Sequence, residues 1–290
     1  MEILGIIAAL ASAASWAFAT VVFDRLGKVV PYAGITFLKG FFSILLMLLL
    51  VMIVGDFKTV SPHDAVILIA SGIIGIAIGD TLFFKSLQDL GAKMQVLYFM
   101  LGQIVTMVLS FLLLGDVLTL KEYIGAMILL CGIVIVTWGR QEDHPNKTLG
   151  IIGGFLSILC FSISTIMIKF TETDIDVISA SFYRMLAGTL IMTLFGLTTH
   201  KMKSWITPLK DFKTLALFLL NVVVITIGGF ILSMYAIKTI SVSLASILST
   251  TEPVFVLLLA YLINHEKVSK RELIGAAVSI LGLLIIILHE

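Results

Sequence analysis

Glu252 is the charged residue with the most informative position, because it lies deep in an apolar run and directly precedes Pro253. It is about 11 residues into a run that begins near residue 241, roughly 16 Å along a helix and close to mid-bilayer. An ionised group there costs about 2.5–3.5 kcal/mol, so the carboxyl must be neutral, paired or facing water. Pro253 predicts a helix kink that frees the carbonyl near Ser249. The pattern predicts a coupling-ion or substrate site; the alternative is a structural carboxyl that closes the kink by bonding Ser249 or Thr250.

Three other charged residues also lie inside apolar runs. Asp80 follows three glycines that permit close helix packing, and it is equally consistent with a binding site and with a helix–helix hydrogen bond. Lys39 and Arg184 lie six or seven residues into their runs, roughly 10 Å deep by helical rise. At that depth both side chains can extend to the membrane surface, so anion binding and a structural role stay open. Spacing alone does not decide whether either cation pairs with Asp80 or Glu252.

Aromatic and amide side chains could complete a pocket for amphipathic solutes. The candidates are Trp16, Tyr98 and Tyr235, together with Gln103 and Asn221. Tyrosine and tryptophan near helix ends are more often interface anchors. Trp16, in the middle of its run, is therefore the strongest candidate of this group.

Other kinds of chemistry have no supporting motif. The two cysteines form no metal-ligand pair, and the five histidines (63, 144, 200, 265 and 289) all fall in predicted loops or at the chain end. No phosphate-binding glycine loop, dinucleotide-binding pattern or nucleophile elbow occurs. We therefore expect no catalytic residues, no metal and no cofactor. The net charge of +1 argues against a nucleic-acid partner.

The composition requires a membrane around these residues. Of 290 residues, 59% are hydrophobic and 13% charged, and the mean hydropathy is +1.14. Soluble domains are about 45–50% apolar and about 25% charged. Each apolar run is long enough to span a bilayer as a helix and lacks the alternation of a barrel strand. We predict an all-α integral membrane protein with ten helices, at about 3–23, 33–54, 65–88, 93–114, 121–139, 149–170, 177–199, 212–237, 241–263 and 271–288.

The sequence contains an internal duplication. A shift of 145 residues places Trp16 on Phe161 and Lys39 on Arg184, and a shift of 150 places Gly79 on Gly229. A five-residue insertion in the Lys-rich stretch 200–213 accounts for the change of shift. We predict repeats at 1–139 and 149–290, joined by a loop at 140–148. Five crossings per repeat force the second repeat to enter from the opposite side, which gives an inverted repeat typical of secondary transporters.

Several motifs resemble the drug/metabolite transporter superfamily, specifically ten-helix proteins with two EamA-type repeats. They are Gly-Asp-Thr-Leu-Phe-Phe at 79–84, Leu-Gly-Ala at 90–92, Thr-Glu-Pro-Val-Phe at 251–255, and an acidic turn with Ile-Gly-Ala at 266–276 and, more weakly, at 116–126. A basic residue early in the second and seventh helices adds to the likeness, which covers essentially the whole chain. The resemblance implies a carrier of small metabolites or drugs, often outward, and does not imply one substrate.

Two positions depart from the pattern of that family. The first repeat has Gly102-Gln103 where the second has Glu252-Pro253, so any role of the Glu-Pro pair exists only once. The first repeat also has Lys39 where the family more often has arginine. A lysine cannot form the two parallel hydrogen bonds that an arginine guanidinium forms with a carboxylate.

The predicted function is a secondary transporter that exports amino-acid-like metabolites or drugs, with protons or exchange as the driving force. The partners are the bilayer and a small solute, with a monomer or homodimer in the cell membrane. Sugar or nutrient uptake is the alternative within the class. A membrane-embedded enzyme, a structural subunit and a channel are other classes, disfavoured because the buried charges are few, dispersed and unequal between repeats. Loops opposite the termini hold twelve lysines and arginines against four on the terminal side, which predicts external termini, whereas the resemblance implies cytoplasmic ones.

Overall fold

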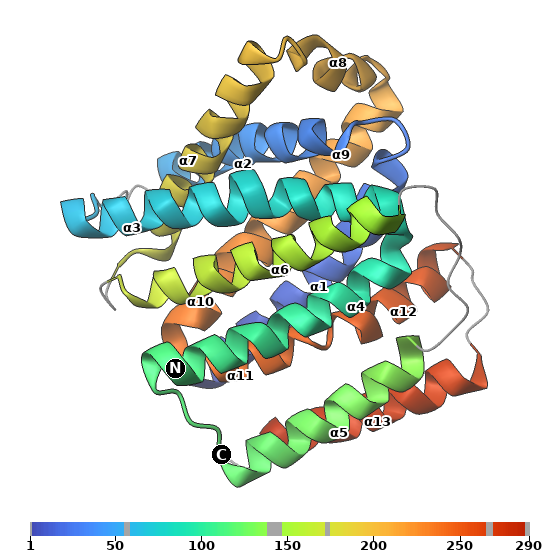
Figure 1. The fold of residues 1–290 in the computed structure, drawn as a ribbon. Helices are drawn as coiled ribbons and strands as arrows, with labels where there is room; N and C mark the ends of the chain where they lie inside the picture. Colours follow the sequence, from blue (N-terminus) through green and yellow to red (C-terminus); the bar gives the residue numbers. More distant parts are fainter. Residues whose placement is uncertain (1, 55–58, 138–146, 172–174, 265–268, 288–290) are drawn as a thin grey trace.

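The computed structural model describes all residues except 1, 55–58, 138–146, 172–174, 265–268 and 288–290. Every regular element in the described ranges is helical, which confirms the all-α prediction (Figure 1). Most of the predicted 140–148 loop and three of the five histidines (144, 265 and 289) lie outside the described residues.

The first repeat contains six helical elements. They are α1 (Glu2–Leu26), α2 (Tyr32–Val54), α3 (Pro62–Gly72), the π-helix η1 (Ile73–Asp80), α4 (Thr81–Leu114) and α5 (Leu120–Thr137). The predicted helices 65–88 and 93–114 are one continuous run from α3 to α4, interrupted only at Gly91, whose φ of 77° and ψ of 168° are not helical. A glycine permits this break because it has no Cβ to clash.

The second repeat follows the same order. It contains α6 (Lys147–Lys169), α7 (Val177–Thr198), α9 (Phe212–Val224), the π-helix η3 (Ile225–Ile231), α10 (Leu232–Thr239), α11 (Val242–Ser249), α12 (Glu252–Asn264) and α13 (Lys270–Ile287). The predicted insertion forms α8 (Met202–Ile206) and the 3₁₀ turn η2 (Thr207–Lys210), which connect α7 to α9 at the top of Figure 1. Trp205 fixes this connection, because its buried ring packs against Phe37 and Phe195.

Side-chain caps define where several helices begin. The carboxylates of Asp176 and Asp211 accept the backbone N–H groups of Ser179 at 2.7 Å and of Thr214 at 2.9 Å. The Ser241 hydroxyl accepts the N–H of Leu244 in the same way, at 3.1 Å. Each cap satisfies one of the free donors of a first helical turn.

Most helices have a length and composition suited to a bilayer. Six described helical runs have at least 18 residues with few charges: Glu2–Leu26, Tyr32–Ile53, Pro62–Gly91, Thr148–Lys169, Val177–Thr198 and Phe212–Thr239. Their outward faces expose large apolar side chains, for example Met52 at 80% and Leu194 at 58%. An apolar outer surface of this extent is suited to lipid.

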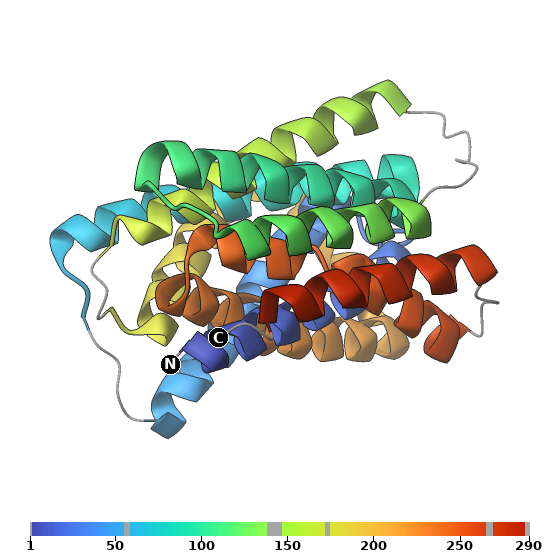
Figure 2. The same ribbon diagram turned by 90° about the horizontal axis from the view of Figure 1, so that it is seen from below.

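The two repeats are related by inversion. Gly132 of α5 lies against Gly275 and Ser279 of α13, while Gly125 lies against Gly282 and Ile286. Residue numbers therefore rise along one helix as they fall along the other, so the two repeat-equivalent helices are antiparallel. Figures 1 and 2 show α5 and α13 side by side. This arrangement is the inverted five-helix repeat that the sequence predicts.

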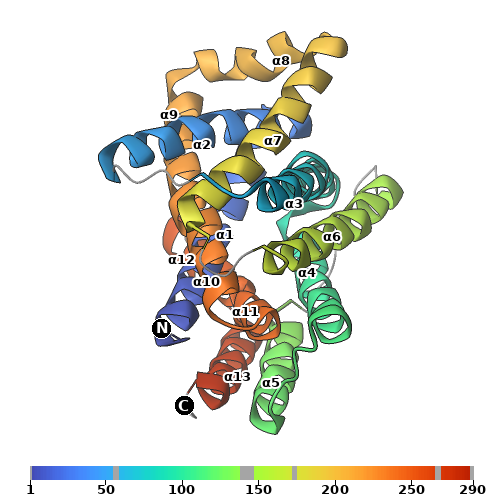
Figure 3. The same ribbon diagram turned by 90° about the vertical axis from the view of Figure 1, so that its left-hand side faces the viewer.

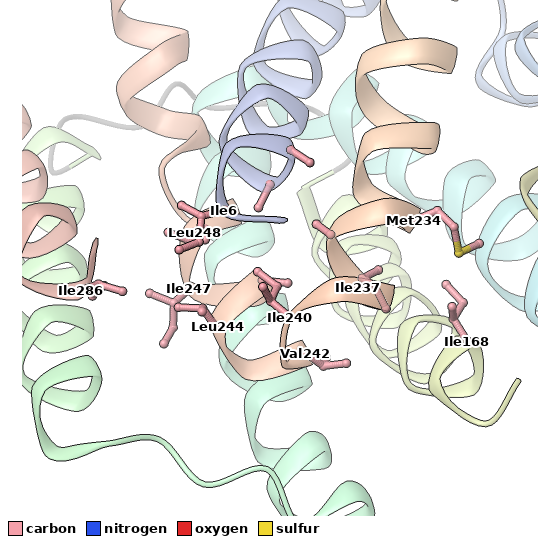
Figure 4. Close-up of a cluster of buried hydrophobic side chains, with 14 of the residues drawn as sticks. Ile6, Ile168, Met234, Ile237, Ile240, Val242, Leu244, Ile247, Leu248 and Ile286 are labelled. Carbon is pink, nitrogen blue, oxygen red and sulfur yellow. The ribbon is translucent and has the colours of Figure 1, made fainter. Parts of the chain in front are cut away.

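Two apolar clusters occupy opposite ends of α1. The first contains Ile6 and Ala9 with residues of α6, α10, α11 and α13 (Figure 4). The second contains Phe23 and Leu26 with aromatic residues of α4 and α9, among others. The middle of α1 lies between these two clusters. Figure 3 shows α8 at one end of the molecule and α5 and α13 at the other.

Candidate functional site

A cavity of about 140 Å³ lies between the two repeats. Its wall is formed by α1, η1 and α4 of the first repeat and by α6, α7, η3, α10, α11 and α12 of the second. On α1 the lining residues are Ala9, Ser12, Ala13 and Trp16. Ala9 belongs to the first apolar cluster, and Trp16 packs against the second. Hydroxyls and aromatic rings alternate around it, a wall suited to an amphipathic small molecule.

The two π-helices bring aromatic side chains to this wall. Gly79 of η1 lies against Phe161 of α6, and Gly229 of η3 lies against Trp16 of α1. These contacts are equivalent under the internal duplication, and both rings line the cavity. π-helical turns frequently occur at functional sites because they realign the helix face locally. Here they occur at the same place in both repeats.

Glu252 lies at the junction of α11 and α12. The chain leaves the α-helix at Thr250 and Thr251 and resumes it at Glu252, directly before Pro253. The carboxyl is 3% exposed and lines the cavity; its Oε1 accepts the Thr20 hydroxyl at 3.2 Å. Its Oε2 has no hydrogen-bond partner among the described residues.

The structural alternative for Glu252 does not match these contacts. The hydroxyl of Ser249 donates to the Ala245 carbonyl at 2.9 Å, and that of Thr250 donates to the Ile247 carbonyl at 2.5 Å. Both hydroxyls therefore stabilise α11, and neither binds the carboxyl.

Lys39 and Asp80 form a buried ion pair between α2 and η1. The ammonium group is fully buried and lies over the rings of Phe230 at 4.7 Å, Phe84 at 5.4 Å and Trp16 at 5.8 Å from their centroids. Aromatic faces attract a cation, most strongly where water is excluded. The expectation that Lys39 extends to the membrane surface is wrong, because its side chain is held inside by the carboxylate and three rings.

Arg184 of α7 lies in the cavity wall. Its Nε donates to the Ser71 hydroxyl at 3.0 Å, and one terminal nitrogen donates to the Ser164 hydroxyl at 3.1 Å. No ion pair includes Arg184 within the ranges that the structure describes. Like Lys39, it points inward and does not extend to the surface.

The remaining candidates divide into two groups. Trp16 and Gln103 line the cavity. Tyr98, Asn221 and Tyr235 do not: Tyr98 packs against Leu90 and Ile158, Tyr235 packs against the first apolar cluster, and the Asn221 amide donates to the Ala19 carbonyl at 3.4 Å.

Several polar residues of the site were not selected from the sequence. Thr20 binds Glu252, whereas Ser71 and Ser164 bind Arg184 and each other. Serine and threonine are common in membrane helices, so type alone did not single them out. The duplication held a partial signal, because it places Thr20 on Thr165, which lines the cavity.

The site suits binding more than bond-breaking chemistry. No group of three or more histidine, cysteine, aspartate or glutamate side chains is placed to hold a metal in the described ranges. What the wall offers is one carboxyl with an unpartnered oxygen, one unpaired guanidinium, hydroxyls and rings. These groups can hold a small solute and exchange a proton.

Comparison with known proteins identifies relatives of the whole chain. The sequence model of the EamA-like transporter family matches residues 3–138 and again residues 148–288. An uncharacterized transporter of Bacillus subtilis, YyaM, is 26% identical over 88% of this chain and 83% of its own length. An uncharacterized transporter of Archaeoglobus fulgidus is 24% identical over 98% of both chains. A protein of known crystal structure superposes with a TM-score of 0.71 at 18% identity, over 99% of this chain and 97% of that one.

Proposed function

The chain belongs to the EamA-like transporter family, and on that premise we propose that it exports small amino-acid-like metabolites or drugs by secondary active transport. Membership of the family makes it a multi-pass integral membrane transporter and not an enzyme. The direction, the substrate class and coupling to protons or to exchange rest on the cavity and its charges.

Glu252 carries the proposal. Its carboxyl is buried, opens onto a cavity shared by both repeats, and keeps one oxygen without a partner in the described part of the chain. A carboxyl in this position can take up a proton while the cavity faces one side and release it after the cavity faces the other. Because a buried charge is costly without a partner, protonation and substrate binding at one site are energetically linked.

The conformational step follows from the repeat architecture. We take 1–139 and 149–290 as the transport units and 140–148 as the connection between them. The apolar clusters at the two ends of α1 would separate alternately as one unit rocks against the other. The break between α11 and α12 at Thr250 and Thr251 provides a local hinge next to Glu252.

A comparison of culture media tests the proposal. Cells that overproduce the protein are compared with cells that overproduce Glu252→Gln at equal membrane level, and the metabolites of the medium are profiled. We expect a small set of amino-acid-like or drug-like compounds to be enriched only by the unaltered protein. The substitution keeps the size of the side chain and removes its ability to exchange a proton.

The matched control is Glu2→Gln, the same change at an exposed position near the chain start. It should export as the unaltered protein does. Depletion of a supplied nutrient without enrichment of any compound would instead establish uptake. Normal pH-dependent export by Glu252→Gln would refute the role of this carboxyl.

A further inference from the structure

Arg184 is a cation without the counterion that its repeat equivalent has. The duplication places Lys39 on Arg184 and Asp80 on Phe230. In the first repeat the cation therefore has a carboxylate, and the two form an ion pair. In the second repeat an aromatic ring occupies the carboxylate position, and no described residue of that repeat forms an ion pair with Arg184.

The charges near Arg184 do not balance. Lys39 and Arg184 contribute two positive charges, and Asp80 contributes one negative charge that contacts Lys39. Asp80 also attracts the Arg184 guanidinium electrostatically, but no carboxylate oxygen of the described residues lies within 4.0 Å of it. Apart from the carboxyl of Glu252, which also lines the cavity and forms no ion pair in the described ranges, one positive charge is left over in the wall.

The hydrogen bonds of Arg184 lead to the same conclusion. A guanidinium has five N–H donors, and only two are used here, by the hydroxyls of Ser71 and Ser164. The two serines also bond each other's backbone carbonyls, which holds them and the guanidinium plane in place. Three donors have no partner in the described part of the chain.

Space for a ligand exists beside these donors. Arg184, Gly75 and Ser164 all line the cavity, so the guanidinium borders its open space. Gly75 lets Ser164 pack closely here, because a Cβ at Gly75 would clash with the Ser164 hydroxyl oxygen, and this packing holds the serine that binds Arg184. An arginine guanidinium that is held in place and has free N–H donors can bind a carboxylate through two parallel hydrogen bonds.

We propose that Arg184 is the anion-binding residue of the cavity and that the transported solute carries a carboxylate, which the guanidinium holds. This inference rests on the proposed function and specifies its substrate class. Glu252 lines the same cavity from α12 and accepts the Thr20 hydroxyl, and no ion pair in the described ranges joins it to Arg184. The anion site therefore does not require the coupling carboxyl.

Three probes with the same phenyl group test the inference. They are 3-phenylpropionate, which carries only a carboxylate, phenethylamine, which carries only an ammonium, and phenylalanine, which carries both. Thermal unfolding of the purified full chain in detergent is measured with each probe at matched ionic strength. We expect 3-phenylpropionate and phenylalanine to raise the midpoint, and phenethylamine to leave it unchanged.

Substitutions locate the effect. Arg184→Gln should weaken carboxylate binding by tenfold or more, whereas Arg271→Gln, at an exposed position outside the cavity wall, should not change it. A second variant, Phe230→Asp, supplies a carboxylate where the first repeat has Asp80. It should weaken carboxylate binding much more than Phe230→Asn does, because both variants remove the ring and only Phe230→Asp adds a negative charge. Equal responses of Arg184→Gln and the unaltered protein, or no difference between the carboxylate and the amine, would overturn the inference.

Failure of this inference can be distinguished from failure of the proposed function. The binding assay requires no transport, so carboxylate binding through Arg184 in a protein that exports nothing supports the anion site and refutes the export proposal. Conversely, if every compound exported in the metabolite profile lacks an anionic group, transport stands and the anion site is refuted.

Discussion

Loss of Asp80 should destabilise the protein much more than loss of Lys39, although the two form one ion pair. Asp80→Asn leaves Lys39 and Arg184 as two buried positive charges with no carboxylate between them. Lys39→Met leaves Asp80 next to the attractive guanidinium of Arg184. The asymmetry follows from the three-charge arrangement and would not exist for an isolated pair.

The expected magnitudes are several kcal/mol. Two unit charges in contact interact by about 4 kcal/mol at an effective dielectric constant of about 20. Removing one partner of a buried pair costs about 3–5 kcal/mol, which we expect for Asp80→Asn. For Lys39→Met we expect about 1–3 kcal/mol, the cost of an incompletely satisfied buried group. The double variant should cost less than the sum of the two single ones, because it leaves no unpaired lysine.

Denaturant unfolding in mixed micelles measures these free energies. The internal control is Lys85–Asp89, a pair four residues apart on α4 at 2.7 Å whose side chains are 27% and 12% exposed. Lys85→Met and Asp89→Asn should each cost about 1 kcal/mol or less. Equal costs for Asp80→Asn and Lys39→Met, or strict additivity in the double variant, would refute the three-charge arrangement.

Three further predictions concern helix packing, backbone conformation and pH dependence. Gly132→Ala should cost about 1–3 kcal/mol of unfolding free energy by overpacking, because its Cβ would lie 2.6 Å from a carbonyl oxygen of α13. In the same unfolding assay Gly153→Ala should be nearly neutral, because its Cβ would lie 3.4 Å from the nearest atom. Gly91→Ala should lower the thermal midpoint more than Gly115→Asn, because the φ and ψ at Gly91 are almost exclusive to glycine, whereas Gly115 (φ 71°, ψ 18°) is left-handed helical and tolerates asparagine. The Asp211 carboxylate accepts a hydrogen bond from the Thr214 N–H, which lowers the pKa of Asp211 in the folded protein. The ionised carboxylate therefore stabilises the fold fully above the unfolded pKa of about 3.9, and this stabilisation is lost as the pH falls through the lower folded pKa. Asp211→Asn should keep the helix cap and lose this pH dependence, so identical curves of thermal midpoint against pH for the two proteins would contradict the prediction.

Much of the fold was predictable because it follows from local patterns. Lipid offers no hydrogen bonds to the backbone, so each apolar run had to be a helix, and the polar breaks located the helix ends to within a few residues. The duplication, with five crossings per repeat, required inversion, which the antiparallel α5 and α13 show. The break at Gly91 falls in the gap predicted between 65–88 and 93–114, and the break at Thr250 and Thr251 lies next to the kink that Pro253 predicts. The π-helical turns η1 and η3 were not predicted, since an α-helix and a π-helix have similar hydropathy.

The site was predictable only in part, and the reason is geometric. The sequence singled out Glu252, Asp80, Lys39, Arg184, Trp16 and Gln103 because charges, amides and central aromatics in lipid-spanning runs are costly or unusual. It also selected Tyr98, Asn221 and Tyr235, which pack elsewhere, because residue type does not state which way a side chain points. Helical periodicity fixes relative directions on one helix and leaves free the rotation of that helix within the bundle.

The sequence by itself determined a membrane transporter of ten helices in two inverted repeats, because hydropathy, crossing number and internal repetition are properties of the chain order. Only the tertiary structure decided which charges meet. Lys39 binds Asp80, Glu252 accepts a hydrogen bond from the Thr20 hydroxyl, and three N–H donors of Arg184 have no partner among the described residues. These pairings join residues as many as 232 positions apart, and no spacing rule reaches across such a distance. They depend on how helices of opposite direction pack around one cavity, which only the folded bundle specifies.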